Sequence, residues 1–174
     1  MKVYVSADME GVAGISSWDE VNPEKREWGL CREQMTREVA AACEGALAAG
    51  ASRVLVKDAH ASGRNLFAEY LPREASIIRG WSRHPLFMVQ ELDASFAALV
   101  MVGYHSRAGS GGNPLAHTYS SSAIALIEVN GSPVAEFHLN AWAAAMLGVP
   151  VALVTGDEAL CEEVQLSLIH ISEP

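Results

Sequence analysis

The sequence has 174 residues, of which 50% are hydrophobic and 19% charged, and 12 Lys and Arg against 21 Asp and Glu leave a formal net charge of −9. The composition is that of a globular protein, and the length predicts one domain or slightly more. The acidic balance, without any Lys/Arg-rich run, argues against a nucleic-acid partner or an anionic membrane surface, since both require clustered positive charge. No apolar run is long enough to cross a bilayer and no secretory leader is recognisable, so we expect a cytoplasmic protein.

Cysteine usage excludes two further classes of structure. Cys31, Cys43 and Cys161 are odd in number, widely spaced and without any CxxC pair. Neither a disulfide framework nor a structural thiolate zinc site is therefore expected. We predict reduced thiols packed in the core.

Short apolar segments alternate with amphipathic segments along the chain. The apolar segments are nearly continuous, which is typical of strands buried on both faces. Apolar residues at helical spacing, followed by Gly50 or Gly148, indicate the two longer helices. We expect strands at 3–7, 53–57, 76–79, 97–103 and 151–155, and helices at 31–49, 139–147 and 158–164.

This order predicts an α/β fold with a mostly parallel sheet flanked by helices, in a doubly wound, three-layer arrangement. Segments 123–129 and 134–137 flank Asn130-Gly131, a dipeptide that favours a tight turn. We therefore expect one inserted antiparallel β-hairpin.

Carboxylates and histidines follow the expected strands. Asp8 and Glu10 are two residues apart, so in extended backbone both side chains leave the same face. Alone this pair is weak evidence, because one carboxylate could cap a helix while the other faces solvent. His60 follows the second strand and His105 follows the fourth. Ligand sites of open α/β sheets form at the carboxyl ends of the strands, so we expect these side chains to converge there.

Two further candidates lie later in the chain. Glu136 stands where the hairpin passes into a helix, a position that the helix dipole alone also favours for a carboxylate. His117 follows a glycine-rich loop, 109–112, which could close over a substrate or simply connect two elements. Asp58, two residues before His60, could orient that imidazole or cap a turn.

Asp, Glu and His without Cys form the ligand set of hydrolytic zinc or manganese sites. One catalytic zinc needs only three protein ligands. The sequence offers five candidates for this role, which are Asp8, Glu10, His60, His105 and Glu136. The surplus suggests two metals about 3.5–4 Å apart that share a carboxylate, with Asp8 as the natural bridge. Such a pair can bind a water, lower its pKa and polarise a carbonyl.

Other conspicuous side chains are predicted to be structural. We expect His138 on a helix surface, although it could line the pocket. The tryptophans are scattered, so we expect them in core or interface packing: Trp18, Trp28, Trp81 and Trp142. Three arginines could bind a peptide carboxylate, but solvated charges are the expected outcome for Arg79, Arg83 and Arg107.

Five short motifs occur in a specific order and at specific spacing. They are Ser6-Ala7-Asp8-Met9-Glu10-Gly11, Asp58-Ala59-His60, Gly103-Tyr104-His105, Ala116-His117 and Glu136-x-x-Leu139-Asn140. In this arrangement the chain, over residues 1 to about 164, resembles the D-aminopeptidases of the dipeptide-transport operon type, a family of binuclear zinc metallopeptidases. The resemblance implies an enzyme that removes N-terminal D-amino acids from short peptides, D-Ala-D-Ala among them. It also implies a homo-oligomeric ring whose active sites face an inner cavity.

Carried over position by position, the resemblance also implies roles for individual residues. The ligands of two zinc ions fall on Asp8, which bridges the metals, and on Glu10, His60, His105 and Glu136. The catalytic histidine falls on His117, whose role as nucleophile, proton shuttle or oxyanion stabiliser is left open.

The family's chains are longer than this one. We expect residues 1–164 to form an N-terminal metal-binding catalytic domain that is truncated at its C-terminal end. Residues 165–174 continue no recognisable period and are expected to be a non-native or read-through tail, with a genuine short C-terminal strand as the alternative.

Two alternative functions stay open. A binuclear metal hydrolase acting on another small amide or on a phosphoester would keep the same ligands, but it would need a cationic pocket or a different base. An inactive truncated fragment would bind metal without turnover.

Overall fold

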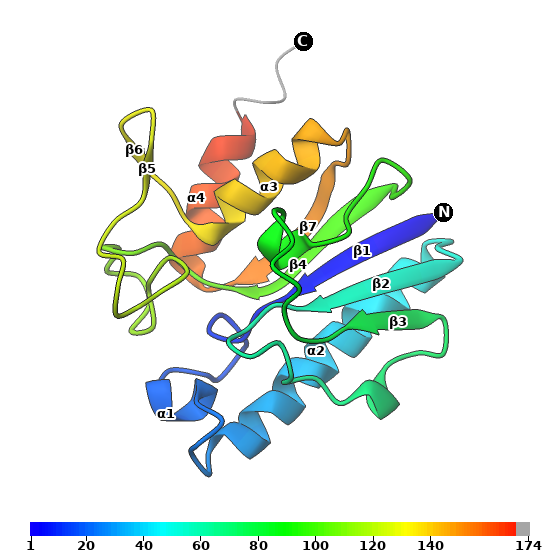
Figure 1. Cartoon of the computed structure of the whole chain (residues 1–174), viewed down its shortest axis with the longest axis horizontal. Helices are drawn as coiled ribbons and strands as arrows, with labels where there is room; N and C mark the ends of the chain where they lie inside the picture. Colours follow the sequence, from blue (N-terminus) through cyan, green and yellow to red (C-terminus); the bar gives the residue numbers. More distant parts are fainter. Residues whose placement is uncertain (170–174) are drawn as a thin grey trace.

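The computed structural model describes the backbone of residues 1–169 and the side chains of residues 1–166. Five parallel strands form one sheet in the order β3-β2-β1-β4-β7, and they span Ala75–Ile78, Arg53–Asp58, Lys2–Ala7, Ala98–Tyr104 and Val151–Gly156 respectively. From β1 the chain adds β2 and β3 on one side and then β4 and β7 on the other. The predicted doubly wound α/β fold is therefore confirmed, with the switch point between β1 and β4 (Figure 1).

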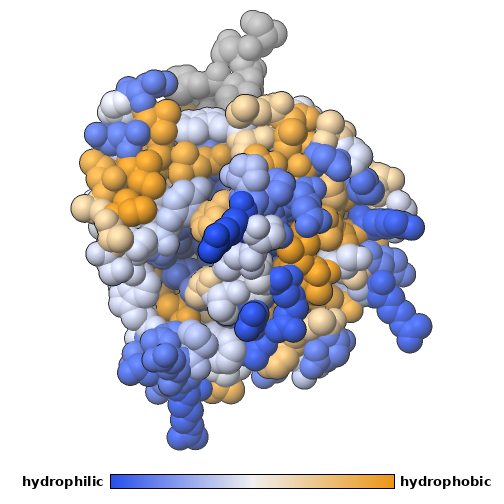
Figure 2. Space-filling model, viewed as in Figure 1, coloured by the Kyte–Doolittle hydropathy of each residue, from blue (hydrophilic) through white to orange (hydrophobic). Residues whose placement is uncertain are grey.

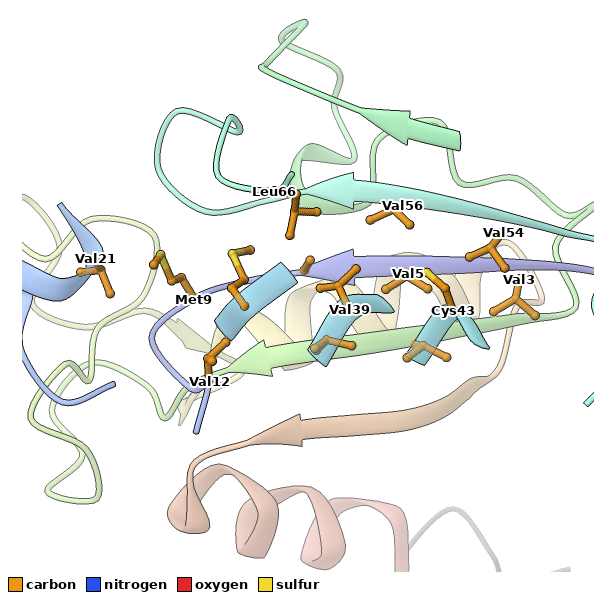
Figure 3. Close-up of a cluster of buried hydrophobic side chains, with 14 of the residues drawn as sticks. Val3, Val5, Met9, Val12, Val21, Val39, Cys43, Val54, Val56 and Leu66 are labelled. Atoms are coloured by element: carbon orange, nitrogen blue, oxygen red, sulfur yellow. The ribbon is translucent and has the colours of Figure 1, made fainter. Parts of the chain in front are cut away.

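Helices cover both faces of this sheet. Helix α2 (Trp28–Ala48) lies on one face, and α3 (Glu136–Met146) and α4 (Glu158–Ile169) lie on the other (Figure 1). On the α2 face, Val5 and Val56 of the sheet pack in one cluster with Val39 and Cys43 (Figure 3). Val39 and Cys43 are four residues apart and so share one side of the helix.

The opposite face has its own core. Tyr4 and Leu99 point away from α2 and belong to a second buried cluster, which also includes Ala144 of α3 and Leu160 of α4. Tyr4 follows the α2-facing Val3, as the alternation of side chains along a strand requires. These two cores fix the strands, and hence the positions from which the loops leave the carboxyl edge.

A short helix at the carboxyl edge was not predicted from the sequence. Helix α1 spans Trp18–Val21, and its first turn is closed by a capping box between Ser17 and Glu20. Ser-Trp-Asp-Glu is the sequence signature of that motif, so the signal was present. Helix α2 also begins at Trp28 rather than at residue 31.

The predicted hairpin is wrong in extent. Its strands shrink to β5 (Glu128–Val129) and β6 (Ser132–Pro133) around Asn130-Gly131, and they pair only with each other. Residues 123–127 join no sheet. Helix α3 begins at Glu136, so residues 136–138 are helical rather than the end of a strand or a connection. The reason is local, because the Ala135 N–H donates to His138 Nδ1 at 3.1 Å and this closes the first helical turn.

Helix α4 extends beyond its predicted end. It continues from Glu158 to Ile169, five residues past the expected stop at 164. Residues 165–169 of the predicted tail thus have helical backbone, and residues 170–174 lie outside the described residues.

The described helices show no membrane-spanning segment, since none within residues 1–169 is both long and apolar enough to cross a bilayer. On the face shown in Figure 2, hydrophobic residues are exposed in separate patches among hydrophilic ones.

Candidate metal centre

The loop after β1 places two carboxylates at the carboxyl edge of the sheet. The Asp8 N–H donates to the Val102 carbonyl at 2.8 Å, which continues the β1–β4 pairing by one residue. The Gly11 N–H then donates to the Gly103 carbonyl at 2.9 Å, and a Cβ at Gly11 would lie only 1.7 Å from the Tyr104 carbonyl oxygen. Only glycine fits this close approach of two backbones. The turn returns Glu10 to the same edge, where its side chain is buried.

Asp8 lies between two sets of donor groups. Its Oδ1 is 3.5 Å from Nδ1 of His60, and Glu10 Oε2 lies 3.0 Å from that same nitrogen. Its Oδ2 is 3.5 Å from Nε2 of His105, and Glu136 Oε1 lies 3.5 Å from that nitrogen. In each set the three donor atoms fall within 4.8 Å of one another, and all the residues are buried. The structure thus brings together all five side chains predicted as ligands.

Backbone carbonyls orient the imidazoles of His60 and His105, which are two of the predicted ligands. His60 Nε2 donates to the Val21 carbonyl at 2.9 Å, and His105 Nδ1 donates to the Ser106 carbonyl at 3.0 Å. In each ring the opposite nitrogen therefore faces the carboxylates. A second hydrogen bond of this kind fixes ring orientation and tautomer at metal sites.

His117 joins the cluster from a loop. Its Nδ1 donates to the Leu115 carbonyl at 2.9 Å, and its Nε2 lies 3.9 Å from both Glu10 Oε1 and Glu136 Oε1. It also forms a third group of potential metal ligands with Glu10 and His105. Geometry alone therefore permits His117 either to bind metal or to carry a proton beside it.

The cluster carries an excess of buried negative charge. Burial, together with the nearby Glu10 carboxylate, raises the pKa of Asp8 to about 8. Burial alone would lower the pKa of His105, but Glu136 and Asp8 outweigh it and raise that pKa to about 10. Burial raises the pKa of Glu10, but the charge of His60 outweighs it, so this pKa lies well below its usual range. The site retains protons where a divalent cation would supply the compensating charge.

Two buried atoms in the cluster lack the partner that a metal ion would supply. Among the described residues, Asp8 Oδ2 and His105 Nε2 are fully buried side-chain atoms without a hydrogen-bond partner. They face each other across 3.5 Å within the set that Glu136 completes. Buried polar atoms are seldom left unpaired, and a metal ion would satisfy both. The donor set of carboxylate oxygens and imidazole nitrogens suits zinc.

Asp58 hydrogen-bonds to a neighbouring loop and does not join the cluster of predicted ligands. Its carboxylate accepts hydrogen bonds from the Asn65 and Leu66 N–H groups, at 2.5 and 2.8 Å, and from Asn65 Nδ2 at 2.8 Å. It therefore caps the loop after β2, which was one of its two predicted roles. Asn65 Nδ2 also donates to the His60 carbonyl at 2.7 Å, so the capped loop supports the backbone of His60.

A cavity of about 610 Å³ opens over the cluster. Trp18 and Trp81 line it, and Trp81 also packs against the second core cluster, as its predicted assignment to core packing requires. Phe87 and Tyr119 also line it and were missed, because isolated aromatic residues in loops carry no periodic signal. His138, Arg79, Arg83 and Arg107 are not among its lining residues.

Asp157 was also missed. It follows β7, and its Oδ2 accepts hydrogen bonds from the Ser106 N–H at 2.6 Å and from Asn113 Nδ2 at 2.9 Å. It thereby holds the segment that follows His105. An aspartate directly beyond a predicted strand was the available signal.

The sequence and the fold also match known proteins. Residues 1–172 match peptidase family M55, described as D-aminopeptidase. The chain belongs to this D-aminopeptidase family. A D-aminopeptidase of Bacillus subtilis (strain 168) is 36% identical over 165 residues, which are 95% of this chain and 59% of that protein.

A solved family structure has the same fold. It is the Zn-dependent D-aminopeptidase DppA from Bacillus subtilis, described as a self-compartmentalizing protease, and it matches with a TM-score of 0.85 and 36% identity. The match covers 94% of this chain and 58% of that one. The chain thus spans about three fifths of the length of these D-aminopeptidases.

Proposed function

We propose that this chain carries the catalytic centre of a zinc-dependent aminopeptidase that removes N-terminal D-amino acids from short peptides such as D-Ala-D-Ala. The observation that carries the proposal is the placement of Asp8 between two buried donor sets, Glu10 with His60 and His105 with Glu136. We assign one zinc ion to each set, with Asp8 as the shared ligand. Membership in the D-aminopeptidase family and the zinc dependence of the Bacillus relative support this assignment.

Bound zinc would supply Lewis-acid chemistry, by lowering the pKa of a water and polarising the scissile carbonyl. The protein's own contribution centres on His117. Because its Nδ1 donates to the Leu115 carbonyl, its Nε2 is free to accept a proton, and this nitrogen faces the carboxylates of Glu10 and Glu136. We propose that His117 accepts at Nε2 a proton from the water that attacks the peptide carbonyl, and that it gives this proton to the leaving amine.

The flanking groups prepare His117 for this task. The ring of His117 stacks on that of His105 and makes a T-shaped contact with Trp18, and its Nε2 lies 3.9 Å from both Glu10 Oε1 and Glu136 Oε1. Holding the base in a fixed orientation reduces the entropic cost of proton transfer.

The lining of the cavity favours an amide substrate over a phosphoester. Its carboxylates and imidazoles are those of Asp8, Glu10, His60, His117 and Glu136, and the described lining includes neither Lys nor Arg. A phosphoester enzyme uses cationic groups to clamp the phosphoryl oxygens. Apart from the proposed zinc ions, the described lining therefore offers no cation to clamp a phosphoryl group.

The test combines metal content with a substrate panel. We expect the purified chain to contain about two zinc ions by inductively coupled plasma mass spectrometry, and to hydrolyse D-Ala-D-Ala but not L-Ala-L-Ala or p-nitrophenyl phosphate. Turnover of the phosphoester alone would establish the rival hydrolase. Bound zinc without any turnover would establish the inactive metal-binding fragment.

Homo-oligomeric assembly into a ring and a cytoplasmic location are part of the same proposal. The description of the Bacillus relative as self-compartmentalizing supports the assembly. Native mass measurement and cell fractionation test the two points separately.

A further inference from the structure

One wall of the cavity is built from aromatic rings that the chemistry above does not use. Trp81 stacks on Phe87, with ring centroids 4.6 Å apart, and Phe87 meets Tyr119 edge-on at 5.1 Å. All three residues line the cavity, and Phe87 remains 43% exposed. We call Trp81, Phe87 and Tyr119 the aromatic wall.

One end of the aromatic wall, Trp81, is held in place by a buried lysine. Lys57 of β2 is completely buried, its Nζ lies 3.8 Å from the centroid of the Trp81 ring, and it donates to the Gly80 carbonyl at 2.6 Å. Trp81 Nε1 donates in turn to the Ala61 carbonyl at 2.7 Å. The Trp81 ring is therefore held in place before any substrate arrives, which lowers the entropic cost of binding against it.

The other end of the aromatic wall reaches the metal centre. The Tyr119 N–H donates to Glu136 Oε1 at 2.6 Å, and the same oxygen lies 3.5 Å from His105 Nε2. The wall thus begins directly beside a proposed zinc ligand. A substrate whose scissile carbonyl binds at the proposed metals would place its N-terminal residue beside this wall.

The backbone of the wall is held in costly conformations. Phe87 and Tyr119 have φ values of 45° and 61°, in the left-handed region that residues other than glycine rarely adopt. Ala61, which accepts the Trp81 hydrogen bond, has φ 45°. Such strain persists where the surrounding structure enforces it, and it is concentrated at ligand-binding sites.

We propose that the aromatic wall binds the side chain of the N-terminal D-residue, and that the enzyme prefers D-residues with aromatic or large aliphatic side chains to D-alanine. This inference rests on the proposed aminopeptidase function. The cavity of about 610 Å³ has room for such a side chain, and Val21 and Pro23 add apolar lining elsewhere in it.

The test uses D-phenylalaninamide and D-alaninamide, which differ only in the side chain under test. With the zinc-loaded chain we expect kcat/KM, measured by ammonia release, to be at least about tenfold higher for D-phenylalaninamide, since even one methylene in an apolar pocket changes specificity by about tenfold or more. Phe87→Ala should remove most of this preference, because kcat/KM should fall more for D-phenylalaninamide than for D-alaninamide. Phe87→Leu should restore part of the preference.

Binding provides a second readout that does not require turnover. Calorimetry of the zinc-loaded chain should give a lower Kd for D-phenylalaninamide than for D-alaninamide, and Phe87→Ala should remove the difference. Tyr70→Ala is the matched control, because Tyr70 is an exposed aromatic residue that is not among those lining the cavity.

The outcomes separate the two proposals. Failure to cleave either amide, with the Kd preference intact, would overturn the proposed function and support the aromatic wall. Equal Kd values, or an equal loss for both amides in Phe87→Ala, would overturn the aromatic wall. A change in native mass of Phe87→Ala without a change in preference would also overturn it, and would make the wall an interface between copies.

Discussion

The imidazole of His117 stacks on that of His105, with ring centroids 4.3 Å apart and planes within 6° of parallel. One ring is an assigned zinc ligand held by the Ser106 carbonyl, and the other is held by the Leu115 carbonyl with Nε2 free. The stack therefore joins a proposed ligand to a proposed proton carrier. It also makes the two roles separable by substitution, because each ring has its own backbone anchor.

His117→Gln should abolish most turnover while zinc content persists. The substitution removes the free Nε2, and loss of a general acid–base group typically lowers kcat by about 10²–10⁴-fold. His105→Gln should instead lower zinc content, since His105 belongs to a donor set with Asp8 and Glu136. Metal analysis and D-Ala-D-Ala kinetics on both variants check this prediction. Loss of zinc in His117→Gln would make His117 a ligand.

Zinc should stabilise the fold through Asp8. A ligand that binds only the native state at about 100 times its Kd contributes about 2.7 kcal/mol, so chelation should lower the Tm of the wild-type chain measurably. Asp8→Ala should bind less zinc and show little response to chelator. The control is Asp19→Ala, which removes an exposed carboxylate paired with Lys25. An equal response to chelator in wild type and Asp8→Ala would contradict the metal assignment.

Gly11→Ala should be severely destabilising. Its Cβ would lie 1.7 Å from the Tyr104 carbonyl oxygen, so the β1 loop and the end of β4 would have to separate. We expect a loss above about 4 kcal/mol, or failure to fold, as for severe overpacking in a core. Gly45→Ala in α2 is the matched control, because its Cβ meets nothing within 4 Å. It should stabilise the chain by about 0.5–1 kcal/mol. Urea unfolding measures both changes, and equal effects would refute the steric argument.

Lys57 should make stability depend on pH above neutrality. Burial lowers the pKa of Lys57 to about 8, below the value of 10.5 expected in the unfolded chain. Between pH 8 and 10.5 the unfolded state binds more protons than the folded state, so the free energy of unfolding rises with pH. Below about pH 8 Lys57 is charged in both states, and the energetic cost of burying that charge is fully present.

The comparison for this prediction is Lys57→Met, which has no titrating amine. From pH 8 to 10.5 the wild-type chain should gain roughly 1–3 kcal/mol relative to the variant, measured by urea unfolding. Because the tyrosines are present in both proteins, their titration cancels when the two free energies of unfolding are subtracted. A parallel pH dependence in both proteins would show that Lys57 titrates normally.

The sequence by itself predicted the doubly wound sheet and the meeting of Asp8, Glu10, His60 and His105. Continuous apolar runs identify buried parallel strands, and parallel strands place whatever follows them at one edge. That argument needs no knowledge of side-chain packing. Glu136 and His117 were candidates as well, but their roles followed only from the family resemblance, because a carboxylate at a helix start and a loop histidine have no strand to place them.

Only the tertiary structure decided how these groups are held and what surrounds them. The carbonyls of Val21, Ser106 and Leu115 select the ring nitrogen that faces the centre in each histidine. Such partners come from loops, whose conformations depend on long-range contacts rather than on periodicity. For the same reason the structure was needed to assign Asp58 as a cap of the loop after β2. The aromatic wall became visible only once separate loops had placed Trp81, Phe87 and Tyr119 side by side.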